Sequence, residues 1–478
     1  MGRKNILFCS SEVAPFSKTG GLADVAGALP KYVAKHENVT IITPLYNDSI
    51  LKDYEAKHIG KKSFGMGDEK VTVNYHSFLR DGVNYVFVEH DSFKRDSLYG
   101  YLDDNRRFFI FDYAILEYIG LANLKVDLLH LNDWQTGMVP FLLNNHYRKQ
   151  PLYKDIKTLI TIHNLQFHGS FDKSTYKYTN LDFSYDYIHF DNFNFLKAGI
   201  LLSDAINTVS ETYKDEIQTE HYGYMLDGLL KDRSADLYGI VNGIDYDIYN
   251  PETDPNIDFN YNKSKFVTGK RNNKALFLKT HGLDQVTSIP LVAFVSRLAK
   301  QKGIDLMLAT LEEVIAQSNA NFAILGSGDE VYENFFNYLA AKYPNRVYAY
   351  IGFSHKLAQK LYASSDIFMM PSEFEPCGLS QMMAMRYGSL PVVRETGGLK
   401  DTVIPYNKYT NEGDGFSFRN YNAHEFKNTL LSAIDLYNNN QTAFRTIQQH
   451  AMEKNFSLEV MGDKYLSLYK KTLQKNRR

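Results

Sequence analysis

Short apolar runs alternate with helical patterns along the first half of the chain. A run such as residues 5–9, apolar at nearly every position, is typical of a strand that is buried on both faces of a sheet. Apolar residues then recur at helical spacing between residues 22 and 33, which places one apolar stripe on a helix. The same alternation predicts strands at 5–9, 38–44, 83–89, 126–132, 157–164, 203–210 and 237–245, and helices at 22–33, 104–120 and 136–147.

The alternation stops once and then restarts. Residues 246–289 are largely polar, contain Pro251 and Pro255, and begin without apolar periodicity, so they predict a linker. Beyond them, strands are predicted at 289–296, 321–328, 346–353, 365–372 and 389–395, and helices at 302–317 and 457–474.

Strands that alternate with helices favour parallel sheets, and two such series predict two domains. We therefore expect an α/β fold with two Rossmann-like, doubly wound domains that face a cleft. The predicted boundaries are 1–245, a linker at 246–289, 290–455, and a final helical segment at 456–478. Because ligands of open α/β sheets bind beyond the carboxyl ends of the strands, the residues that follow each strand are the candidates for a site.

Composition narrows the functional class. The 478 residues are 44% hydrophobic and 23% charged, with a formal net charge of −2, so no global positive field favours nucleic acid or an anionic membrane. Cys9 and Cys377 form no CxxC pair, which argues against a disulfide framework. The N-terminal apolar run is too short for a signal peptide, and no run is long enough to span a membrane. A cytoplasmic protein is the expectation.

Two similar glycine turns precede helical patterns, KTGGLADV at 18–25 and ETGGLKDT at 395–402. Glycines allow close approach of a ligand to the backbone, and a helix N-terminus favours an anion. Lys18 adds a full charge to the first turn, whereas Glu395 precedes the second. Neither turn matches the P-loop or the dinucleotide fingerprint. Ordinary solvated turns would explain the same residues.

Charged residues follow two strands of the second series. In SRLAKQKG, Arg297 and Lys302 could offset the charge of a leaving diphosphate, although surface cations are common in such loops. In SEFEPCGL, Glu375 could accept hydrogen bonds from sugar hydroxyls, or simply interact with a helix dipole. Cys377 fits a packed residue better than a nucleophile.

Histidines and an aspartate follow strands of the first series, in HLNDWQTG and TIHNLQFHG. The spacing of His130, Asp133, His163 and His168 matches no metal-binding signature, so recognition of a neutral polyol is the favoured interpretation. Residues 171–195 mix aromatic, hydroxyl and acidic side chains, which suits either sugar stacking or loop packing.

In their order and spacing, KTGGLADV, HLNDW, TIHNL, SRLAKQKG and FEPCGLSQ resemble the bacterial glycogen synthases and plant starch synthases, from about residue 4 to about residue 455. This resemblance implies a GT-B fold whose C-terminal helix crosses back to the first domain. It also implies transfer of glucose from ADP-glucose to the non-reducing 4-hydroxyl of an α-1,4-glucan such as glycogen, with retention of configuration. No metal or other cofactor is implied.

The resemblance also assigns roles to particular residues. The expected catalytic residues are Glu375 at the donor sugar, Arg297 and Lys302 at the diphosphate, and His163 at the glucose. The expected donor-binding residues are Lys18, Gly20, Gly21, Asn242, Phe353, Cys377, Gly378, Leu379, Thr396, Gly397 and Gly398, with Phe353 against the adenine. Asp133 is assigned to the acceptor side from its position.

One departure from the wider GT-B pattern is visible. Many retaining GT-B transferases carry a second glutamate eight residues after the first, where this chain has Met383. Ribose recognition must therefore come from elsewhere. The competing interpretations are a related transferase that uses UDP-glucose, a GT-B sugar-nucleotide epimerase, and an inactive glucan-binding paralogue, although all the charged residues named above are present.

Overall fold

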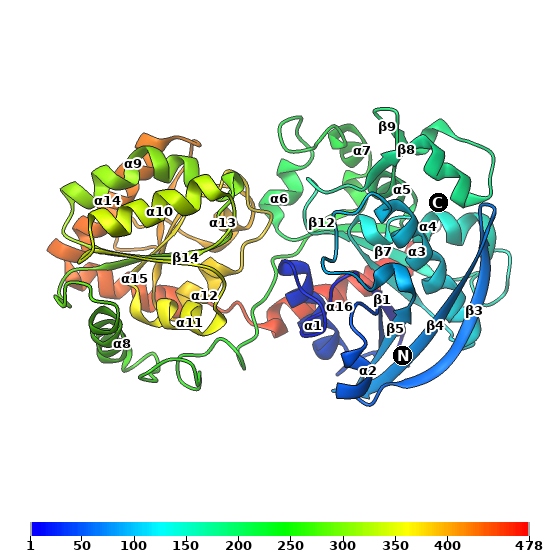
Figure 1. Cartoon of the computed structure of the whole chain (residues 1–478), viewed down its shortest axis with the longest axis horizontal. Helices are drawn as coiled ribbons and strands as arrows, with labels where there is room; N and C mark the ends of the chain where they lie inside the picture. Colours follow the sequence, from blue (N-terminus) through cyan, green and yellow to red (C-terminus); the bar gives the residue numbers. More distant parts are fainter. Residues whose placement is uncertain (1, 477–478) are drawn as a thin grey trace. The chain divides into compact units, whose positions relative to one another are not determined.

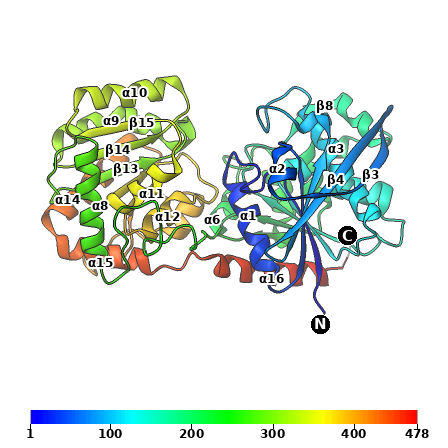
Figure 2. The same cartoon turned by 60° about the horizontal axis from the view of Figure 1, so that its bottom comes forward.

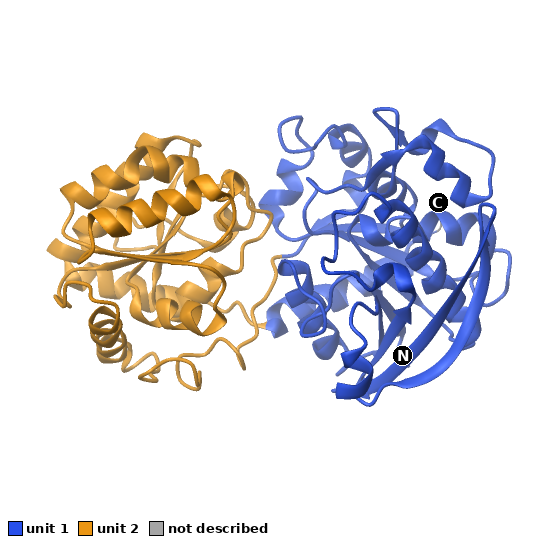
Figure 3. Ribbon diagram, in the orientation of Figure 1, with its two compact units in different colours: residues 1–240, 458–478 blue, residues 241–457 orange. Residues whose placement is uncertain are grey.

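The computed structural model describes residues 2–476 and divides into two compact units (Figure 3). Unit 1 contains the chain up to Ile240 together with the segment from Leu458, and unit 2 contains Val241–Ser457. No helix among the described residues is long and apolar enough to cross a membrane.

Unit 1 is built on a nine-stranded sheet in the order β12-β11-β7-β6-β1-β2-β5-β4-β3 (Figure 1). The strands from β12 to β5 are parallel, and β4 and β3 extend the sheet as an antiparallel hairpin. The bounds are β1 Asn5–Cys9, β2 Asn38–Pro44, β3 Lys57–Met66, β4 Glu69–Arg80, β5 Val83–Glu89, β6 Leu128–Asn132, β7 Lys157–Ile162, β11 Ala205–Thr208 and β12 Leu237–Gly239. A separate small sheet contains β8 Ser170–Asp172, β9 Ile188–His189 and β10 Asn192–Asn194.

Helices cover the central strands of this sheet. The main ones are α1 Gly21–Val33, α3 Asp104–Leu121, α5 Phe195–Leu202 and α16 Leu458–Gln474, and the shorter ones are α2 Ser49–Asp53, α4 Val139–Leu142, α6 Glu211–Glu216 and α7 Asp227–Asp232. Phe8 of β1 packs in one core with residues of α1 and α16. Its neighbour Cys9 points away, toward Asp112 of α3, as the two-residue period of a strand requires. Apolar residues on both faces therefore explain the unbroken apolar run of β1.

The C-terminal helix α16 packs beside α1 in unit 1 (Figure 2). A buried polar network ties it to the sheet: Tyr469 Oη lies 2.7 Å from His130 Nδ1, and Asn207 Nδ2 donates to Tyr465 Oη at 2.9 Å. His130 Nε2 also lies 2.9 Å from Thr161 Oγ1, so both ring nitrogens are used inside the core. His130 is therefore a structural residue rather than a ligand-binding one.

Unit 2 is built on a six-stranded parallel sheet in the order β15-β14-β13-β16-β17-β18. In Figure 1, α9, α10 and α14 lie on one side of it and α8, α11, α12 and α15 on the other. The strands are β13 Leu291–Val295, β14 Asn321–Gly326, β15 Val347–Ile351, β16 Ile367–Met370, β17 Leu390–Arg394 and β18 Phe416–Phe418. The helices are α8 Phe266–Thr280, α9 Ile304–Gln317, α10 Glu330–Lys342, α11 His355–Ser364, α12 Ser380–Arg386, α13 Gly397–Thr402, α14 Ala423–Asn439 and α15 Gln441–Glu453.

The segment predicted as a linker, 246–289, is instead part of unit 2 and contains the helix α8. The buried face of this helix includes Lys270 and Lys274, which a hydropathy pattern scores as exposed. Lys270 Nζ donates to the backbone oxygens of Tyr362, Ala363 and Tyr387, and Lys274 Nζ lies 2.8 Å from Asp366. Burial lowers the pKa of Lys270 to about 7. Carbonyl and carboxylate partners satisfy these lysines, so the helix is buried without an apolar stripe.

A second difference concerns residues 136–147, where the apolar spacing predicts one helix. The chain forms α4 and then a turn of π-helix at Leu143–Tyr147. The strand hairpin of β3 and β4 was also not predicted. The edge strand β3 is mostly exposed and carries lysines rather than an apolar run, whereas β4 has an alternation of Val71, Val73 and Tyr75 that could have indicated a half-buried strand.

Candidate active site

The strand order of each sheet identifies the edge where a ligand should bind. In unit 1 the chain passes from β1 to β2 on one side, while β6 pairs with β1 on the other. In unit 2 the corresponding neighbours are β13 and β16. Such a topological switch point opens a crevice beyond the carboxyl ends of the two strands. The residues after β1, β6, β13 and β16 are therefore the candidates, and they include most of the residues that the sequence singled out.

In unit 1, the first glycine turn follows β1 and leads into α1. Gly20 is the N-cap of α1 and Gly21 its first residue. The carboxylate of Glu12 accepts hydrogen bonds from the backbone amides of Thr19 at 2.6 Å and Gly20 at 3.2 Å. The amide of Gly20 therefore already has an anionic partner inside the protein, and the assignment of Gly20 and Gly21 to the donor site stays a prediction. Lys18 is half-exposed and lies 2.6 Å from Asp24.

Asp133 follows β6 in a strained conformation. Its φ of 55° and ψ of −171° lie in a region that is almost restricted to glycine, at a cost of about 1–3 kcal/mol. Its Oδ1 accepts a hydrogen bond from the backbone amide of His163 at 2.7 Å. Burial nevertheless raises the pKa of Asp133 to about 7, and the backbone amides of His163 and Asn164 only partly oppose the shift. A carboxyl group with this pKa can take up or release a proton near neutral pH.

His163 follows β7 and is buried beside Asp133. Its Nε2 lies 2.9 Å from Oδ1 of Asn132, whose Nδ2 in turn donates to the backbone oxygen of Cys9 at 2.9 Å. Because Oδ1 of an amide can only accept, Nε2 of His163 carries the proton and Nδ1 presents a lone pair. Burial lowers the pKa of His163 to about 3, so the ring is neutral. His163 is thus suited to accept a hydrogen bond from a hydroxyl group.

In unit 2, Lys302 and Glu375 form an ion pair at the edge beyond β13 and β16. Lys302 Nζ lies 2.7 Å from Oε2 of Glu375, and Oγ of Ser372 donates to the same oxygen at 3.0 Å. Both charged side chains are largely buried, at 12% and 9% exposure. Within residues 2–476 no hydrogen bond involves Oε1 of Glu375. Glu375 therefore has one fixed oxygen and one available oxygen.

The second glycine turn packs directly against the loop that carries Glu375. The amide of Gly398 donates to the backbone oxygens of Glu375 and Pro376, at 3.1 and 3.2 Å. A Cβ on Gly397 would lie 2.0 Å from the oxygen of Glu375, and Gly397 has a φ of +43°. These glycines therefore allow close packing of the two loops. The amide of Thr396 donates to the backbone oxygen of Arg394, so it also has a partner inside the protein. The donor-binding role of Thr396–Gly398 stays a prediction.

The loop before α12 presents its amides instead. Among the described residues, the backbone amides of Cys377, Gly378 and Leu379 form no hydrogen bond with the protein. The backbone amide of Asn242 donates to Sγ of Cys377, and burial raises the pKa of that thiol to about 12. Oδ1 of Asn242 is buried and has no hydrogen-bond partner in the described structure. Cys377 is thus a packed, protonated residue, and Asn242 retains an acceptor for a ligand.

Arg297 and Phe353 are the most exposed of the predicted residues of unit 2. Arg297 follows β13, is exposed, and forms no ion pair within residues 2–476. Phe353 follows β15 with 83% of its surface exposed. The structure therefore leaves both side chains accessible to a ligand, and it fixes neither of them.

Several polar residues of these two sites were missed at the level of sequence. They are Glu12, Asn132, Ser372 and Gln381. Gln381 is fully buried and its Nε2 donates to the oxygens of Cys377 and Gly378. Glu12, Asn132 and Ser372 lie at or directly after strand ends, which is the signal that could have identified them.

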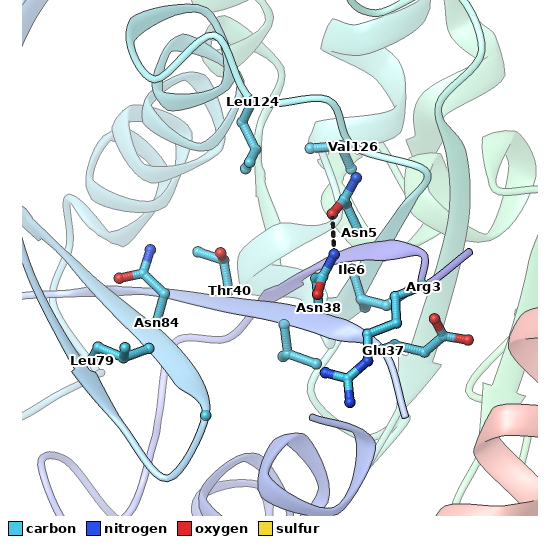
Figure 4. Close-up of a pocket in the computed structure, with 12 residues that line it drawn as sticks. Arg3, Asn5, Ile6, Glu37, Asn38, Thr40, Leu79, Asn84, Leu124 and Val126 are labelled. Atoms are coloured by element: carbon cyan, nitrogen blue, oxygen red, sulfur yellow. Dashed lines mark hydrogen bonds between the residues drawn. The ribbon is translucent and has the colours of Figure 1, made fainter. Parts of the chain in front are cut away.

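One pocket of unit 1 lies away from these residues. A pocket of about 220 Å³ is lined by Arg3, Asn38, Thr40 and Asn84, at the amino ends of β1, β2 and β5 (Figure 4). This is the edge of the sheet opposite to Glu12 and Asp133. No three His, Cys, Asp or Glu side chains among residues 2–476 gather as a metal-binding group.

Comparison with known proteins agrees with the two-part organisation. Residues 5–232 match the starch synthase catalytic domain, and residues 284–463 match the glycosyl transferases group 1. The chain is 52% identical to glycogen synthase from Acholeplasma laidlawii over 97% of this chain and 98% of that protein. It is 43% identical to glycogen synthase from Bacillus licheniformis, over 98% of each.

Solved structures show the same similarity. The catalytic domain of starch synthase IV from Arabidopsis thaliana matches with a TM-score of 0.88 and 30% identity, covering 99% of this chain and 100% of that one. Sucrose-phosphate synthase from Thermosynechococcus elongatus shares the fold, with a TM-score of 0.63 at 16% identity over 98% and 99% of the two chains. With its motifs in register on two Rossmann-like units, the chain belongs to the glycogen and starch synthase family of GT-B glycosyltransferases.

Proposed function

We propose that this glycosyltransferase moves glucose from ADP-glucose to the non-reducing 4-hydroxyl of an α-1,4-glucan, with retention of configuration. The observation that carries the proposal is the buried Lys302–Glu375 pair at a switch point, next to the unpaired amides of residues 377–379. The Arabidopsis starch synthase IV domain was solved with ADP and acarbose, which supports an adenine diphosphate donor and a glucan acceptor. A cytoplasmic location stays part of the proposal.

The departing diphosphate needs positive charge as the glycosidic bond to phosphate breaks. Arg297 and Lys302 supply two cations, and the amides of residues 377–379 supply neutral donors. Lys18 supplies a third cation if it exchanges Asp24 for phosphate. Because the amides of Gly20, Thr396 and Gly398 already have partners in the protein, side-chain charge carries more of this task than the glycine turns do.

The glucose hydroxyls would be recognised by hydrogen-bond acceptors of the protein. We assign hydroxyl contacts to Nδ1 of His163, Oδ1 of Asn242 and Oε1 of Glu375. Phe353 would stack on the adenine, as its exposure permits.

Retention follows if the acceptor attacks from the face that the diphosphate leaves. A phosphate oxygen then takes the proton of the attacking 4-hydroxyl as the new bond forms, so no second enzymic carboxylate is needed, in contrast to a retaining glycosidase. We place Asp133 on the acceptor side, where its pKa of about 7 would let it hydrogen bond the hydroxyl in either protonation state.

The direct test is incorporation of labelled glucose into glycogen from ADP-glucose, with UDP-glucose as competitor. We expect incorporation from ADP-glucose and little competition. Preferred incorporation from UDP-glucose would indicate the related transferase, release of free sugar or epimer without incorporation would indicate other chemistry, and binding of glycogen without turnover would indicate an inactive paralogue.

We further propose that no metal ion takes part, since the cationic side chains suffice for the diphosphate. Treatment with EDTA is then expected to leave the rate of glucose transfer unchanged. The measurement is kcat before and after chelation, and then after each of Mg²⁺ and Mn²⁺ is restored. A large loss that either ion reverses would contradict the metal-free proposal.

Replacement of Gly20 by alanine tests donor approach at the first turn. The added Cβ would meet no protein atom within 4 Å, so the melting temperature should not change. If the donor phosphates approach this N-cap, the methyl group should raise KM for ADP-glucose roughly tenfold through misplacement. Gly228→Ala is the matched control, because that position in α7 is equally open. An unchanged KM in Gly20→Ala would remove Gly20 from the donor site.

A further inference from the structure

A buried carboxylate that has no role in the proposed chemistry contacts the first glycine turn, residues 18–21, which is called the Lys18 turn below. Glu12 follows β1 and is only 4% exposed. Its Oε2 accepts from the amides of Thr19 and Gly20, and its Oε1 accepts from Oγ1 of Thr19 at 2.6 Å and from Oη of Tyr99 at 2.8 Å. Four donors therefore converge on one buried carboxylate, and all of them belong to the turn or to the loop behind it.

We propose that Glu12 is the positioning residue of the donor-binding turn. It is the internal anion that the turn binds, and it fixes the direction of residues 18–21 before any substrate arrives. Within the described residues, the amide of Gly21 forms no hydrogen bond, so it remains available beside Lys18. This inference rests on the proposed function, because it takes the Lys18 turn as part of the donor site.

The loop that carries Tyr99 is itself rigidly held. Arg107 of α3 is fully buried and donates to the backbone oxygens of Ser92 and Leu98, at 2.8 and 3.2 Å. It also forms an ion pair with Asp104, whose Oδ2 accepts from the amide of Gly100 at 2.8 Å. Tyr99 is thus presented to Glu12 from a fixed support, and its hydroxyl lies 2.7 Å from Oγ of Ser11 as well. This support makes Glu12 a rigid link rather than a mobile side chain.

Two substitutions of Glu12 can distinguish the role of its hydrogen bonds from the role of its charge. Glutamine in its place can accept from the two amides with Oε1 and donate with Nε2 to the hydroxyl of Thr19 or Tyr99, because hydroxyl groups both donate and accept. Glu12→Gln should therefore keep the turn in place without the charge. Glu12→Ala removes the acceptor and leaves the two amides without this partner.

Asp204 offers a matched control in the same unit. Its Oδ2 accepts from the amide of Thr158 at 2.8 Å and from Oγ1 of Thr158 at 3.1 Å, which is the same type of contact that Glu12 makes with Thr19. It lies at the start of β11, at the opposite edge of the sheet. Asp204→Ala should lower stability without affecting the turn.

The experiment measures KM for ADP-glucose and kcat at saturating glycogen, ADP binding by calorimetry, and the melting temperature of each full-length variant. For Glu12→Ala we expect KM and the Kd for ADP to rise roughly 10- to 100-fold, as misplacement of a binding group does. Glu12→Gln should stay within about threefold of the parent, and Asp204→Ala should keep both constants unchanged. Tyr99→Phe, which loses one bond to Glu12, should shift both constants in the same direction by less.

Three results would overturn the proposal. Equal losses in Glu12→Gln and Glu12→Ala would show that the charge itself is used, and equal losses in Asp204→Ala would show that only general stability matters. Unchanged constants in a folded Glu12→Ala would show that the turn holds itself. If Glu12→Ala does not fold, unchanged constants in Tyr99→Phe would have the same meaning. The unsubstituted protein is assayed first for glucose transfer from ADP-glucose. A lack of transfer there would contradict the proposed function, whereas the variants test only the role of Glu12.

Discussion

Glu375→Ala is expected to lower kcat by roughly 10³-fold, the upper range for loss of one electrostatic group at a reacting centre. One oxygen of Glu375 is fixed by Lys302 and Ser372. In the mechanism that we propose, the other oxygen would face the donor sugar, where positive charge would develop as the diphosphate leaves. The change also leaves Lys302 buried without its partner. We therefore expect a lower melting temperature together with the loss of turnover.

The two effects can be separated with a second buried ion pair in unit 2. Lys274 and Asp366 lie 2.8 Å apart and are 2% and 7% exposed, so Lys274→Ala breaks a pair of comparable burial at the start of β13. It should lower the melting temperature while kcat of the folded enzyme stays near that of the parent. Near-normal turnover in Glu375→Ala would return this glutamate to a purely structural role in the loop before α12.

Arg297→Ala is expected to lower kcat by about 10²–10³-fold without a change in stability. The side chain is exposed and makes no ion pair among the described residues, so its removal leaves no buried charge unpaired. Substitution of Lys302 would be harder to interpret, because it would leave the buried Glu375 without its ion-pair partner. The measurement is kcat and KM at saturating glycogen, with the melting temperature of each variant.

Arg271→Ala serves as the control, since Arg271 is also exposed in unit 2 but lies on α8. Arg297→Lys should recover part of the rate, because it restores the charge without the planar, bidentate guanidinium. Turnover close to the parent value in Arg297→Ala would exclude this residue from stabilisation of the diphosphate.

Much of the fold was predictable because its strands are buried on both faces. The runs at 5–9, 38–44 and 83–89 match β1, β2 and β5 to the residue, and the helix at 104–120 matches α3 to within one residue. The helix α8 was not, because its buried face contains lysines, and the edge strand β3 was not, because it is mostly exposed. The alternation of Val71, Val73 and Tyr75 in β4 was a signal that could have indicated the hairpin.

Some features of the candidate site could also be predicted from the sequence, and others could not. The positions of Arg297, Lys302, Glu375 and Asp133 after strands made them candidates, because the carboxyl ends of parallel strands share one edge of a sheet. Their roles stay predictions. The ion-pair and hydrogen-bond partners of these side chains could not be predicted from the sequence. That Lys302 meets Glu375, or that Oδ1 of Asp133 binds the amide of His163, depends on loops that approach across the sheet.

The amino-acid sequence by itself determined the alternation of strands and helices, the family and the chemical identity of the candidate residues, since each depends on local pattern and spacing. Only the tertiary structure decided which donors are already used. The two glycine turns, KTGGL and TGGL, have nearly the same sequence. The amide of Gly20 nevertheless donates to the Glu12 carboxylate, whereas that of Gly398 donates to the backbone oxygens of residues 375 and 376. The physical reason is that hydrogen bonds are short and directional, so their partners depend on where distant segments of the chain meet.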